Sequence, residues 1–370
     1  MPHPKKKLIV VIGTRPEAIK LAPVVLAIEQ SEWASCEVVL TGQHRDLVDP
    51  IIRDFGLTVA HDLQAMQPNQ SLSQVTARIL AGIDGFLGQS MPDAVLGQGD
   101  TASVLATSMA CFFRNIAFAH VEAGLRTGNL RLPFPEEMNR VLTTRMTDWH
   151  FAPTDVARTN LLHEGIDPAT IWVTGNTVID ALHHVLLQSC PPLPSRPGRD
   201  FVLVTAHRRE NLGSALENVC SAIKTLAQGH PELDFIFPVH PNPGVRLAVN
   251  KHLLGIANVL LIEPCDYPVF CWLMKGARLI LSDSGGVQEE APALGKPVLV
   301  LRDETERPEA VAVGATRLVG TEPGNIIGAV QVLLSDAASY ERMATAGSPY
   351  GDGHAAQRIV DVLHRSLARR

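Results

Sequence analysis

The sequence has no excess of basic residues, no long apolar run and no closely spaced cysteine pairs. Its 370 residues include 32 Lys and Arg against 38 Asp and Glu, which gives a net charge of −6. A general nucleic-acid binder is therefore not expected, because such proteins need surplus cations to neutralise phosphates. No stretch approaches the roughly 18 apolar residues of a membrane-spanning helix. A local basic site for one anionic ligand remains compatible with this composition.

The cysteines and histidines give no sign of a disulfide framework or a metal site. None of the six cysteines forms a CxxC pair, and buried thiols are the expected state in a chain of this length. No spacing of His, Cys and carboxylates is typical of metal ligands. The six are Cys36, Cys111, Cys190, Cys220, Cys265 and Cys271.

The N-terminal stretch "MPHPKKKLIVVIGTRPE" combines a basic run with a short apolar one. The apolar run is too short for the core of a signal peptide, and it leads directly into a charged turn. It is better interpreted as a first buried strand. Together with the lack of a long apolar run, this predicts a soluble cytoplasmic protein.

Chain length and periodicity predict two α/β domains. A chain of 370 residues is too long for one ordinary core. Short apolar runs alternate with helical patterns, which is typical of parallel, doubly wound sheets. The expected strands are 8–13, 36–42, 93–98 and 116–121 in the first half, and 201–207, 234–240, 258–264, 277–284 and 297–303 in the second.

The proline-rich stretch "LQSCPPLPSRPGRD" at 187–200 interrupts this alternation and predicts a linker. We therefore expect an N-terminal domain over 1–187, a linker over 188–200 and a C-terminal domain over 201–354. The final helix, within 355–370, could pack on either domain. Two such Rossmann-like domains facing each other would form a cleft, and ligands of these sheets bind beyond the carboxyl ends of the strands.

The first strand-to-helix turn, "GTRPEAIK", is a candidate anion site. Gly13 permits the turn, and Pro16 suits the first helical position. Free N–H groups at the helix start, together with Arg15 and Lys20, could bind a phosphate. The alternative is that Arg15 only lies on a solvated edge.

"GQGDTA" at 97–102 matches a dinucleotide-binding fingerprint, and Glu122 follows at about the expected distance. We nevertheless expect no nicotinamide site. The fingerprint normally lies on the first such turn, and Asp100 would place a carboxylate where pyrophosphate must lie. The turn is better suited to present Asp100 to a cleft, and a helix N-cap is the alternative role for this residue.

"SDSGGVQEEAP" at 282–292 is a second candidate phosphate site, formed by backbone N–H groups and the Ser284 hydroxyl. A serine nucleophile is not favoured, because the G-x-S-x-G pattern is missing. Glu289 or Glu290 could accept hydrogen bonds from ribose hydroxyls, or could simply place favourable charge near a helix N-terminus. Arg307, in "ETERPEA", is a further candidate for a phosphate clamp.

Histidines and aromatics in the second half are weaker candidates. His207 ends a strand in "TAHRRE", and the arginines after it, beginning with Arg208, favour a ligand role over a structural one. His240, in "VHPNP", carries less evidence. "YPVF" at 267–270 is expected to place Tyr267 and Phe270 on a loop, where an aromatic ring could stack on a base, or where both could serve packing alone.

The stretch "HVEAGLRTGNLRLPFPEEMNR" from 120 to 140 is rich in acids and arginines. Glu136 and Glu137 precede Arg140 by four and three residues, so helical ion pairs explain them without any function. Glu122 instead follows a buried strand, as Asp100 does, and both should reach the same edge of one sheet. Several acids opposite an Arg and Lys clamp indicate proton movement next to a phosphate leaving group.

Taken together, these motifs resemble those of the non-hydrolysing UDP-N-acetylglucosamine 2-epimerases over nearly the whole chain. The matching segments include "GTRPEAIK", "TGQHR", "QGDT", "HVEAGLRTG", "PFPEEMNR", "VTGNTVID", "HRREN", "HPNP", "DYPVF", "SDSGGVQEEAPALGKPVLVLRDETERPEA" and "GDGHAAQRI". The resemblance implies two Rossmann-like domains of the glycosyltransferase-B type. It also implies interconversion of UDP-GlcNAc and UDP-ManNAc, through 2-acetamidoglucal and without nicotinamide or any other cofactor, for cell-surface polysaccharide biosynthesis.

The resemblance also implies roles for particular residues and partners. UDP-GlcNAc would be the substrate and also an allosteric activator, and the protein would be a homodimer. The implied catalytic residues are Asp100, Glu122, Glu136 and His207; the implied substrate-binding residues are Arg15, Lys20, Phe270, Ser284, Gly285, Gly286, Glu290 and Arg307; the implied allosteric residues are Gln43, His44, Gln70, Arg208 and His240.

Other activities on the same architecture remain open. A glycosyltransferase would need an acceptor, a hydrolysing epimerase would release free ManNAc and UDP, and a UDP-sugar sensor would bind without turnover. The carboxylate set argues against a sensor, because binding a dianion does not require acids.

Overall fold

The computed structural model describes residues 5–42, 45–208 and 213–369. The chain divides into two compact units, which are treated separately below: unit 1 comprises Met1–His184 and Tyr350–Arg370, and unit 2 comprises Val185–Pro349. Both are α/β units with parallel sheets, which confirms the predicted fold class. No helix of the described residues is long and apolar enough to cross a membrane.

Within the described part of unit 1, seven parallel strands form one sheet in the order β3-β2-β1-β4-β5-β6-β7. Its central strands are runs of fully buried residues, because helices cover both faces of such a sheet. The strands are β1 (Lys6–Ile12), β2 (Ala34–Leu40), β3 (Val59–Asp62), β4 (Ala94–Gln98), β5 (Ala117–Val121), β6 (Trp149–Ala152) and β7 (Ile171–Val173).

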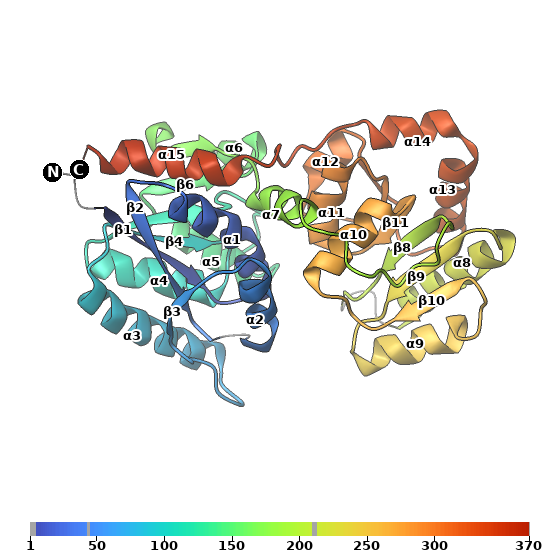
Figure 1. The fold of residues 1–370 in the computed structure, drawn as a ribbon, viewed down its shortest axis with the longest axis horizontal. Coiled ribbons are helices and arrows are strands. Elements are labelled where there is room, and N and C mark those ends of the chain that lie inside the picture. Colours follow the sequence, from blue (N-terminus) through green and yellow to red (C-terminus); the bar gives the residue numbers. More distant parts are fainter. Residues whose placement is uncertain (1–4, 43–44, 209–212, 370) are drawn as a thin grey trace. The chain divides into compact units, whose positions relative to one another are not determined.

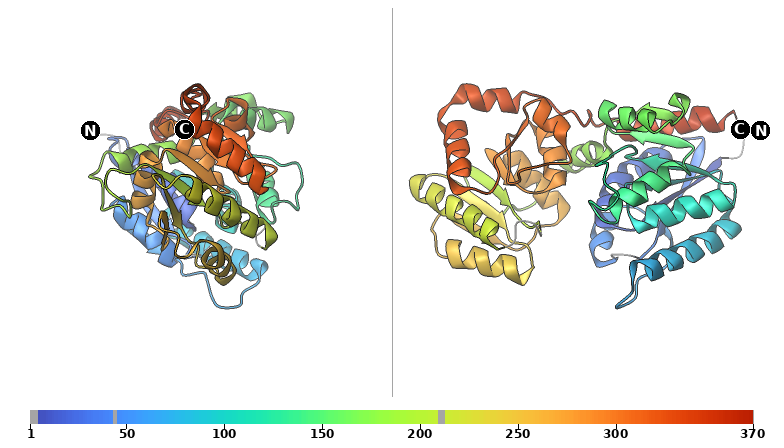
Figure 2. Two further views of the ribbon diagram at one scale, coloured as in Figure 1. Left: turned by 90° about the vertical axis from the view of Figure 1, so that its right-hand side faces the viewer. Right: turned by 180° about the vertical axis from the view of Figure 1, so that it is seen from behind.

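The helices of unit 1 form two packed groups (Figures 1 and 2). In one group, α1 (Arg15–Glu29) contacts both α2 (Arg45–Asp54) and the C-terminal helix α15 (Ala355–Leu367). In the other, α4 (Ala102–Phe113) contacts α3 (Leu72–Ser90) and α5 (Glu136–Thr144). The remaining helices are α6 (Asp155–His163), the 3-10 turn η1 (Pro168–Thr170) and α7 (Thr177–Leu186), which crosses the unit boundary.

The described part of unit 2 has a six-stranded parallel sheet in the order β10-β9-β8-β11-β12-β13. Its strands are β8 (Phe201–Thr205), β9 (Asp234–Pro238), β10 (Val259–Ile262), β11 (Leu279–Ser282), β12 (Val298–Val300) and β13 (Thr316–Leu318). Its helices are α8 (Ser214–Gly229), α9 (Pro243–Leu253), α10 (Tyr267–Gly276), α11 (Gly285–Glu290), η3 (Ala291–Leu294), α12 (Pro308–Ala312), α13 (Pro323–Ser335) and α14 (Ala337–Ala344).

Each unit has its own hydrophobic core between sheet and helices. Phe118 of β5 is fully buried in unit 1, and Phe235 and Phe237 of β9 are fully buried in unit 2. Burying a side chain of this size stabilises the fold by roughly 1.5–3 kcal/mol relative to exposing it. These cores fix the strands, and with them the turns at the strand ends.

In both sheets the strand order reverses next to the first strand, between β1 and β4 in unit 1 and between β8 and β11 in unit 2. Helices that leave the two strands at such a point diverge, so the loops there stay open at the carboxyl edge, where ligands of these folds bind. The turns after β1, β4, β8 and β11 therefore occupy the most favourable positions for a site.

The strands predicted from sequence all occur, with ends that differ by at most three residues, but β3, β6, β7 and β13 were not predicted. Three of these four lie at a sheet edge or are only three residues long, so they lack a continuous apolar run. The cysteine prediction was right about free thiols but only partly about burial. Cys111, Cys220 and Cys271 are buried, whereas Cys36 and Cys265 are half-buried and Cys190 is exposed.

Candidate functional site

The β1–α1 turn of unit 1 is built around a buried acid that sequence analysis did not select. Glu17 accepts hydrogen bonds from the Gly13 N–H at 2.6 Å and from the Thr14 hydroxyl at 3.1 Å. Burial raises the pKa of Glu17 to about 7, opposed by hydrogen bonds that include one from Thr101 in the β4–α4 turn. Glu17 thus connects two adjacent strand-end turns. Among the described residues, no ion pair engages the Arg15 guanidinium at the start of α1.

Glu122 lies directly after β5 in a strained backbone conformation, with φ of +64°. Its carboxylate forms an ion pair with Lys20 of α1, and both side chains are about one-tenth exposed. Asn176, the residue directly before α7, donates its side-chain N–H to the same carboxylate oxygen at 3.0 Å. The strain and these two donors hold the carboxylate in one place at the carboxyl edge of the sheet.

Asp100 follows β4, and three side chains fix its turn. The Asn139 amide donates to the Asp100 carbonyl at 2.8 Å, and His120 Nε2 lies 2.7 Å from the Gly99 carbonyl. The Arg140 guanidinium lies 3.2 Å from Asp100 Oδ2. Burial raises the pKa of Asp100 to about 6; Arg140 and Lys20 oppose this, whereas the charges of Glu122 and Glu136 add to it.

The two acids at the start of α5 have different surroundings. Glu137 is almost fully buried and accepts hydrogen bonds from the N–H groups of Thr127 and Gly128, each at 3.0 Å. It also forms the expected helical ion pair with Arg140, at 3.2 Å. Glu136 is half-buried, and its charge acts on Asp100. Glu137 therefore orders the loop before α5, while Glu136 belongs with the acids at the strand ends.

In unit 2, the carboxyl ends of β8 and β11 bring His207 to Asp283. The buried Asp283 accepts hydrogen bonds from the N–H groups of His207 and Arg208, each at 2.8 Å, and its other oxygen lies 3.2 Å from His207 Nδ1. The ring of His240 stacks on that of His207 with centroids 5.7 Å apart. Burial lowers the pKa of His207, Asp283 raises it, and His240 and Arg208 lower it further.

The turn after β11 places Ser284 and two glycines beside Arg307. A Cβ at Gly285 would lie 3.0 Å from the Arg307 guanidinium carbon, so the arginine would have to shift by a few tenths of an ångström to admit a larger residue. The same guanidinium pairs with Glu289 at 2.9 Å and with Glu306 at 3.2 Å. Backbone N–H groups and a cation thus share the carboxyl end of β11.

Two expectations for this region were wrong. "YPVF" is not a loop, because α10 begins at Tyr267, with a proline at one of its first two positions. Tyr267 is buried and donates its hydroxyl to Glu290 Oε2 at 2.8 Å, and Phe270 is half-buried on the same helix. Glu289 and Glu290 end the six-residue helix α11 instead of starting it, so a favourable N-terminal charge does not explain them.

The predicted allosteric residues fall in different parts of the chain. Gln43 and His44 lie outside the described residues. Gln70, in unit 1, bridges its own loop through Gln67 N–H and the Ala65 carbonyl. In unit 2, Arg208 and His240 both lie beside His207.

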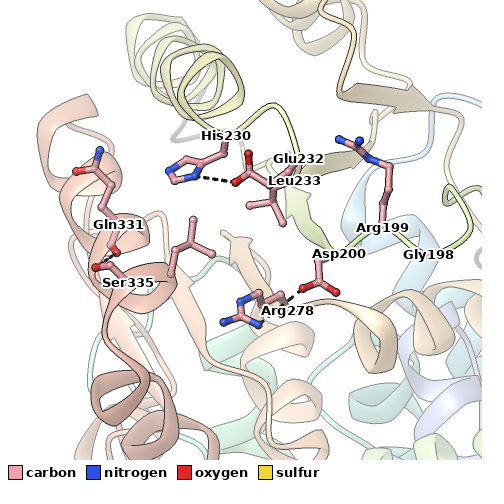
Figure 3. A pocket seen from close by; sticks show the side chains of 10 residues that line it. Gly198, Arg199, Asp200, His230, Glu232, Leu233, Arg278, Gln331 and Ser335 are labelled. Atoms are coloured by element: carbon pink, nitrogen blue, oxygen red, sulfur yellow. Dashed lines mark hydrogen bonds and ion pairs between the residues drawn. The ribbon is translucent and has the colours of Figure 1, made fainter.

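A hollow of about 900 Å³ in unit 2 lies away from these residues, at the amino ends of the strands (Figure 3). Its charged side chains pair with each other or with nearby strand residues: Arg278 lies 3.8 Å from Asp200, His230 lies 3.3 Å from Glu232, and Arg199 pairs with Asp234 at 2.9 Å. None of the predicted site residues lines it, so it does not bear on the candidate site.

Sequence reasoning missed Glu17, Asn139, Arg140 and Asn176 as parts of the site. All four stand in motifs that had been noticed: Asn139 and Arg140 in "PFPEEMNR", and Glu17 and Asn176 in "GTRPE" and "VTGNT", at strand-to-helix turns. That position was the available signal, since polar side chains at such turns reach the ligand edge of the sheet.

Comparisons with known proteins identify the family of the chain. The family model described as UDP-N-acetylglucosamine 2-epimerase matches residues 6–364. The chain is 48% identical to the UDP-N-acetylglucosamine 2-epimerase of Escherichia coli strain K12, with 96% of this chain and 98% of the relative covered.

Solved structures give the same result. The UDP-GlcNAc 2-epimerase from Neisseria meningitidis, bound to UDP-GlcNAc, is 45% identical with a TM-score of 0.89, over 97% of this chain and 100% of that one. MurG of Acinetobacter baumannii, at 16% identity and a TM-score of 0.59 over 98% of this chain and 100% of that one, shares the fold alone. The chain belongs to the UDP-N-acetylglucosamine 2-epimerase family.

Proposed function

We propose that this protein interconverts UDP-N-acetylglucosamine and UDP-N-acetylmannosamine by elimination and re-addition of UDP. The observation that carries the proposal is the group of acids at the carboxyl edge of the unit 1 sheet. Asp100, Glu122 and Glu136 come from three separate elements, yet their charges act on one another, and Lys20 pairs with one of them. A site that only bound a diphosphate would gain nothing from such a cluster, because it repels anions.

The reaction needs these acids because the C2 hydrogen of the sugar is not acidic in the substrate. When the C1–O bond to UDP breaks, C1 gains oxocarbenium character and the proton on C2 becomes removable. A base takes that proton, and the C–H electron pair forms the C1–C2 double bond of 2-acetamidoglucal. Protonation of C2 from the other face and attack of the UDP oxygen on C1 complete the inversion. No net oxidation occurs, so the scheme requires no nicotinamide.

The proposed catalytic residues are Asp100, Glu122, Glu136 and His207. A carboxylate beside C1 stabilises the positive charge of the ring, and acid–base residues move the proton, each typically contributing about 10²–10⁴-fold. Burial and neighbouring anions raise the pKa of Asp100 to about 6, close to the neutral pH at which a residue can both take and return a proton. The C2 proton leaves from one face of the sugar and returns to the other. A proton-transferring group is needed on each face, which accounts for more than one acid.

We propose that UDP is held by cations and strand-end turns. The cations proposed to act on the diphosphate are Arg15, Lys20 and Arg307. Charge-assisted hydrogen bonds of this kind stabilise a departing phosphate. The supporting observation is the arginine over the glycine turn after β11. The other residues proposed to contact the nucleotide are Phe270, Ser284, Gly285, Gly286 and Glu290.

We further propose that a second molecule of UDP-GlcNAc binds as an activator and that the protein works as a homodimer. The residues proposed to bind the activator are Gln43, His44, Gln70, Arg208 and His240. Arg208 shares the Asp283 carboxylate with His207, and the His240 ring stacks on His207, which supports the link to the proposed chemistry. Sigmoidal initial rates in UDP-GlcNAc, and hyperbolic rates in His240→Ala, are the expected result; hyperbolic rates in the native protein would contradict activation.

Turnover of UDP-GlcNAc in D₂O, without acceptor or nicotinamide, tests the proposal. We expect NMR to show UDP-ManNAc with deuterium at C2, and small amounts of free UDP and 2-acetamidoglucal. Product that retains its original C2 hydrogen would contradict the mechanism. Free ManNAc as the main product would indicate a hydrolysing epimerase, and no turnover without an acceptor would indicate a glycosyltransferase.

A further inference from the structure

Arg140 of α5 is a buried cation between two carboxylates, one of which is the proposed catalytic residue Asp100. Its side chain is only 8% exposed. One guanidinium nitrogen lies 3.2 Å from Asp100 Oδ2, and another lies 3.2 Å from Glu137 Oε2. A guanidinium presents its N–H groups in a rigid plane, so contacts at two of them fix its orientation.

Glu137 contacts a second nitrogen of the Arg140 guanidinium, Nε. Its side chain is 1% exposed, and it accepts two backbone N–H groups of the loop before α5. These two backbone donors hold the Glu137 carboxylate in place. The Asp100 contact is therefore made by a cation that is itself anchored, unlike a surface arginine that samples many rotamers.

The charged side chains around Asp100 come from three segments: α1, the turn after β5, and α5. Glu122 and Glu136 raise the pKa of Asp100, and Asp100 in turn raises the pKa of Glu17. Lys20, the other cation there, pairs with Glu122. Arg140 is the stronger of the two cations acting on Asp100.

Resting on the proposed function, we propose that Arg140 is a positioning residue that orients the Asp100 carboxylate and keeps it ionised at neutral pH. It acts through Asp100 and has no contact with substrate in this role. Asn139, the preceding residue on α5, fixes the backbone of the same turn through the Asp100 carbonyl. The helix thus controls both the place and the charge of one acid, through two neighbouring side chains with separable effects.

Arg140→Met tests the charge. Without the guanidinium, we expect the pKa of Asp100 to rise by at least about one pH unit, since an opposite charge at this distance usually lowers an Asp pKa by about 1–3. Carboxyl ¹³C NMR of Asp-labelled protein, with the Asp100 signal assigned by Asp100→Asn, measures this directly. The acid limb of the kcat/KM profile should move by the same amount, so activity lost at pH 7 returns in part above pH 8.

Three further variants separate charge from position and from general damage. Arg140→Lys keeps the charge and should leave the acid limb near its native place. Asn139→Ala should lower kcat about tenfold or more through misplacement, without moving the limb. Arg126→Met is the matched control, because Arg126 is equally buried in unit 1 and pairs with Glu164, not Asp100; it should not move the Asp100 titration.

The inference is overturned if Asp100 titrates in Arg140→Met as in the native protein, or if Arg126→Met shifts it equally. Should Arg140→Met not fold, a shift of the acid limb in Arg140→Lys, which keeps the charge, or in Asn139→Ala, which keeps Arg140, would contradict the assignment. The NMR titration does not depend on turnover. If the native protein fails to epimerise UDP-GlcNAc, the proposed function is overturned. The NMR titration of Asp100 would still decide whether Arg140 lowers the pKa of Asp100.

Discussion

The carboxyl edges of the two sheets share a plan and differ in chemistry. In each unit the strand order reverses beside the first strand, and polar residues follow the two strands at that point. In unit 1 these residues are acids from distant elements, and burial raises the pKa of Glu17 and Asp100 toward neutrality. In unit 2 the edge carries a glycine turn beneath Arg307. The same topology provides a location, and the side chains decide the reaction.

The arginines proposed to bind the diphosphate also differ between the two units, in whether they already form ion pairs. Among the described residues, Arg15 of unit 1 has no ion pair, whereas Arg307 of unit 2 pairs with two carboxylates. A phosphate that meets Arg15 gains a new contact, while one that meets Arg307 must share it with Glu289 and Glu306. The first residue is therefore free to serve binding alone, and the second also serves the fold.

The largest effect should come from the acid cluster. We expect Glu122→Gln to reduce kcat by about 10²–10⁴-fold, because it removes a charge that Lys20 and Asn176 hold in place. UDP affinity, measured by calorimetry, should change little. Glu37→Gln is the control, since Glu37 also pairs with a lysine of unit 1, Lys7, at 2.8 Å on a partly exposed surface. Native turnover in Glu122→Gln would remove Glu122 from the mechanism.

The two arginines should give the next largest effects and separate the two edges. Arg15→Ala and Arg307→Ala should each weaken UDP binding roughly 10- to 100-fold, the usual loss for a hydrogen bond to a charged group. Only Arg307→Ala should also destabilise the fold, by about 3 kcal/mol, because it takes a partner from the buried Glu289. Urea unfolding and UDP titration measure both quantities. Equal stability losses would refute this distinction, and unchanged UDP affinity would refute the clamp.

The smallest effect concerns stability against pH. Burial raises the pKa of Glu17 from its ordinary 4.5 to about 7. Between these values the folded protein keeps a proton that the unfolded chain has released, so stability is highest below about pH 4.5 and falls as pH rises toward 7. This contribution, on the order of 3 kcal/mol, should disappear in Glu17→Gln.

Urea unfolding at pH 5 and pH 7.5 checks this. The native protein should lose more stability between the two pH values than Glu17→Gln, and Glu37→Gln should behave as the native protein does. If Glu17→Gln loses as much unfolding free energy between pH 5 and pH 7.5 as the native protein does, Glu17 does not titrate as described.

The sequence predicted central strands better than edges, and single residues better than their partners. Continuous apolar runs identify strands that are covered on both faces, whereas β3, with a half-buried end and exposed His61, carries no such run. Asp100 and Glu122 could be selected because each follows a buried strand. The contact of Arg140 with Asp100 could not, because the helical spacing already explained Arg140 through Glu137.

The sequence by itself determined the α/β class, the parallel strands and which residues stand at their carboxyl ends, because these depend on local periodicity and on turns of a few residues. Only the tertiary structure decided the strand order, and so which turns are neighbours at the point of reversal. It also decided which ion pairs form across 40 to 100 residues of sequence, such as Arg140 with Asp100 and Lys20 with Glu122. Such pairs depend on how the elements pack, which local patterns do not encode.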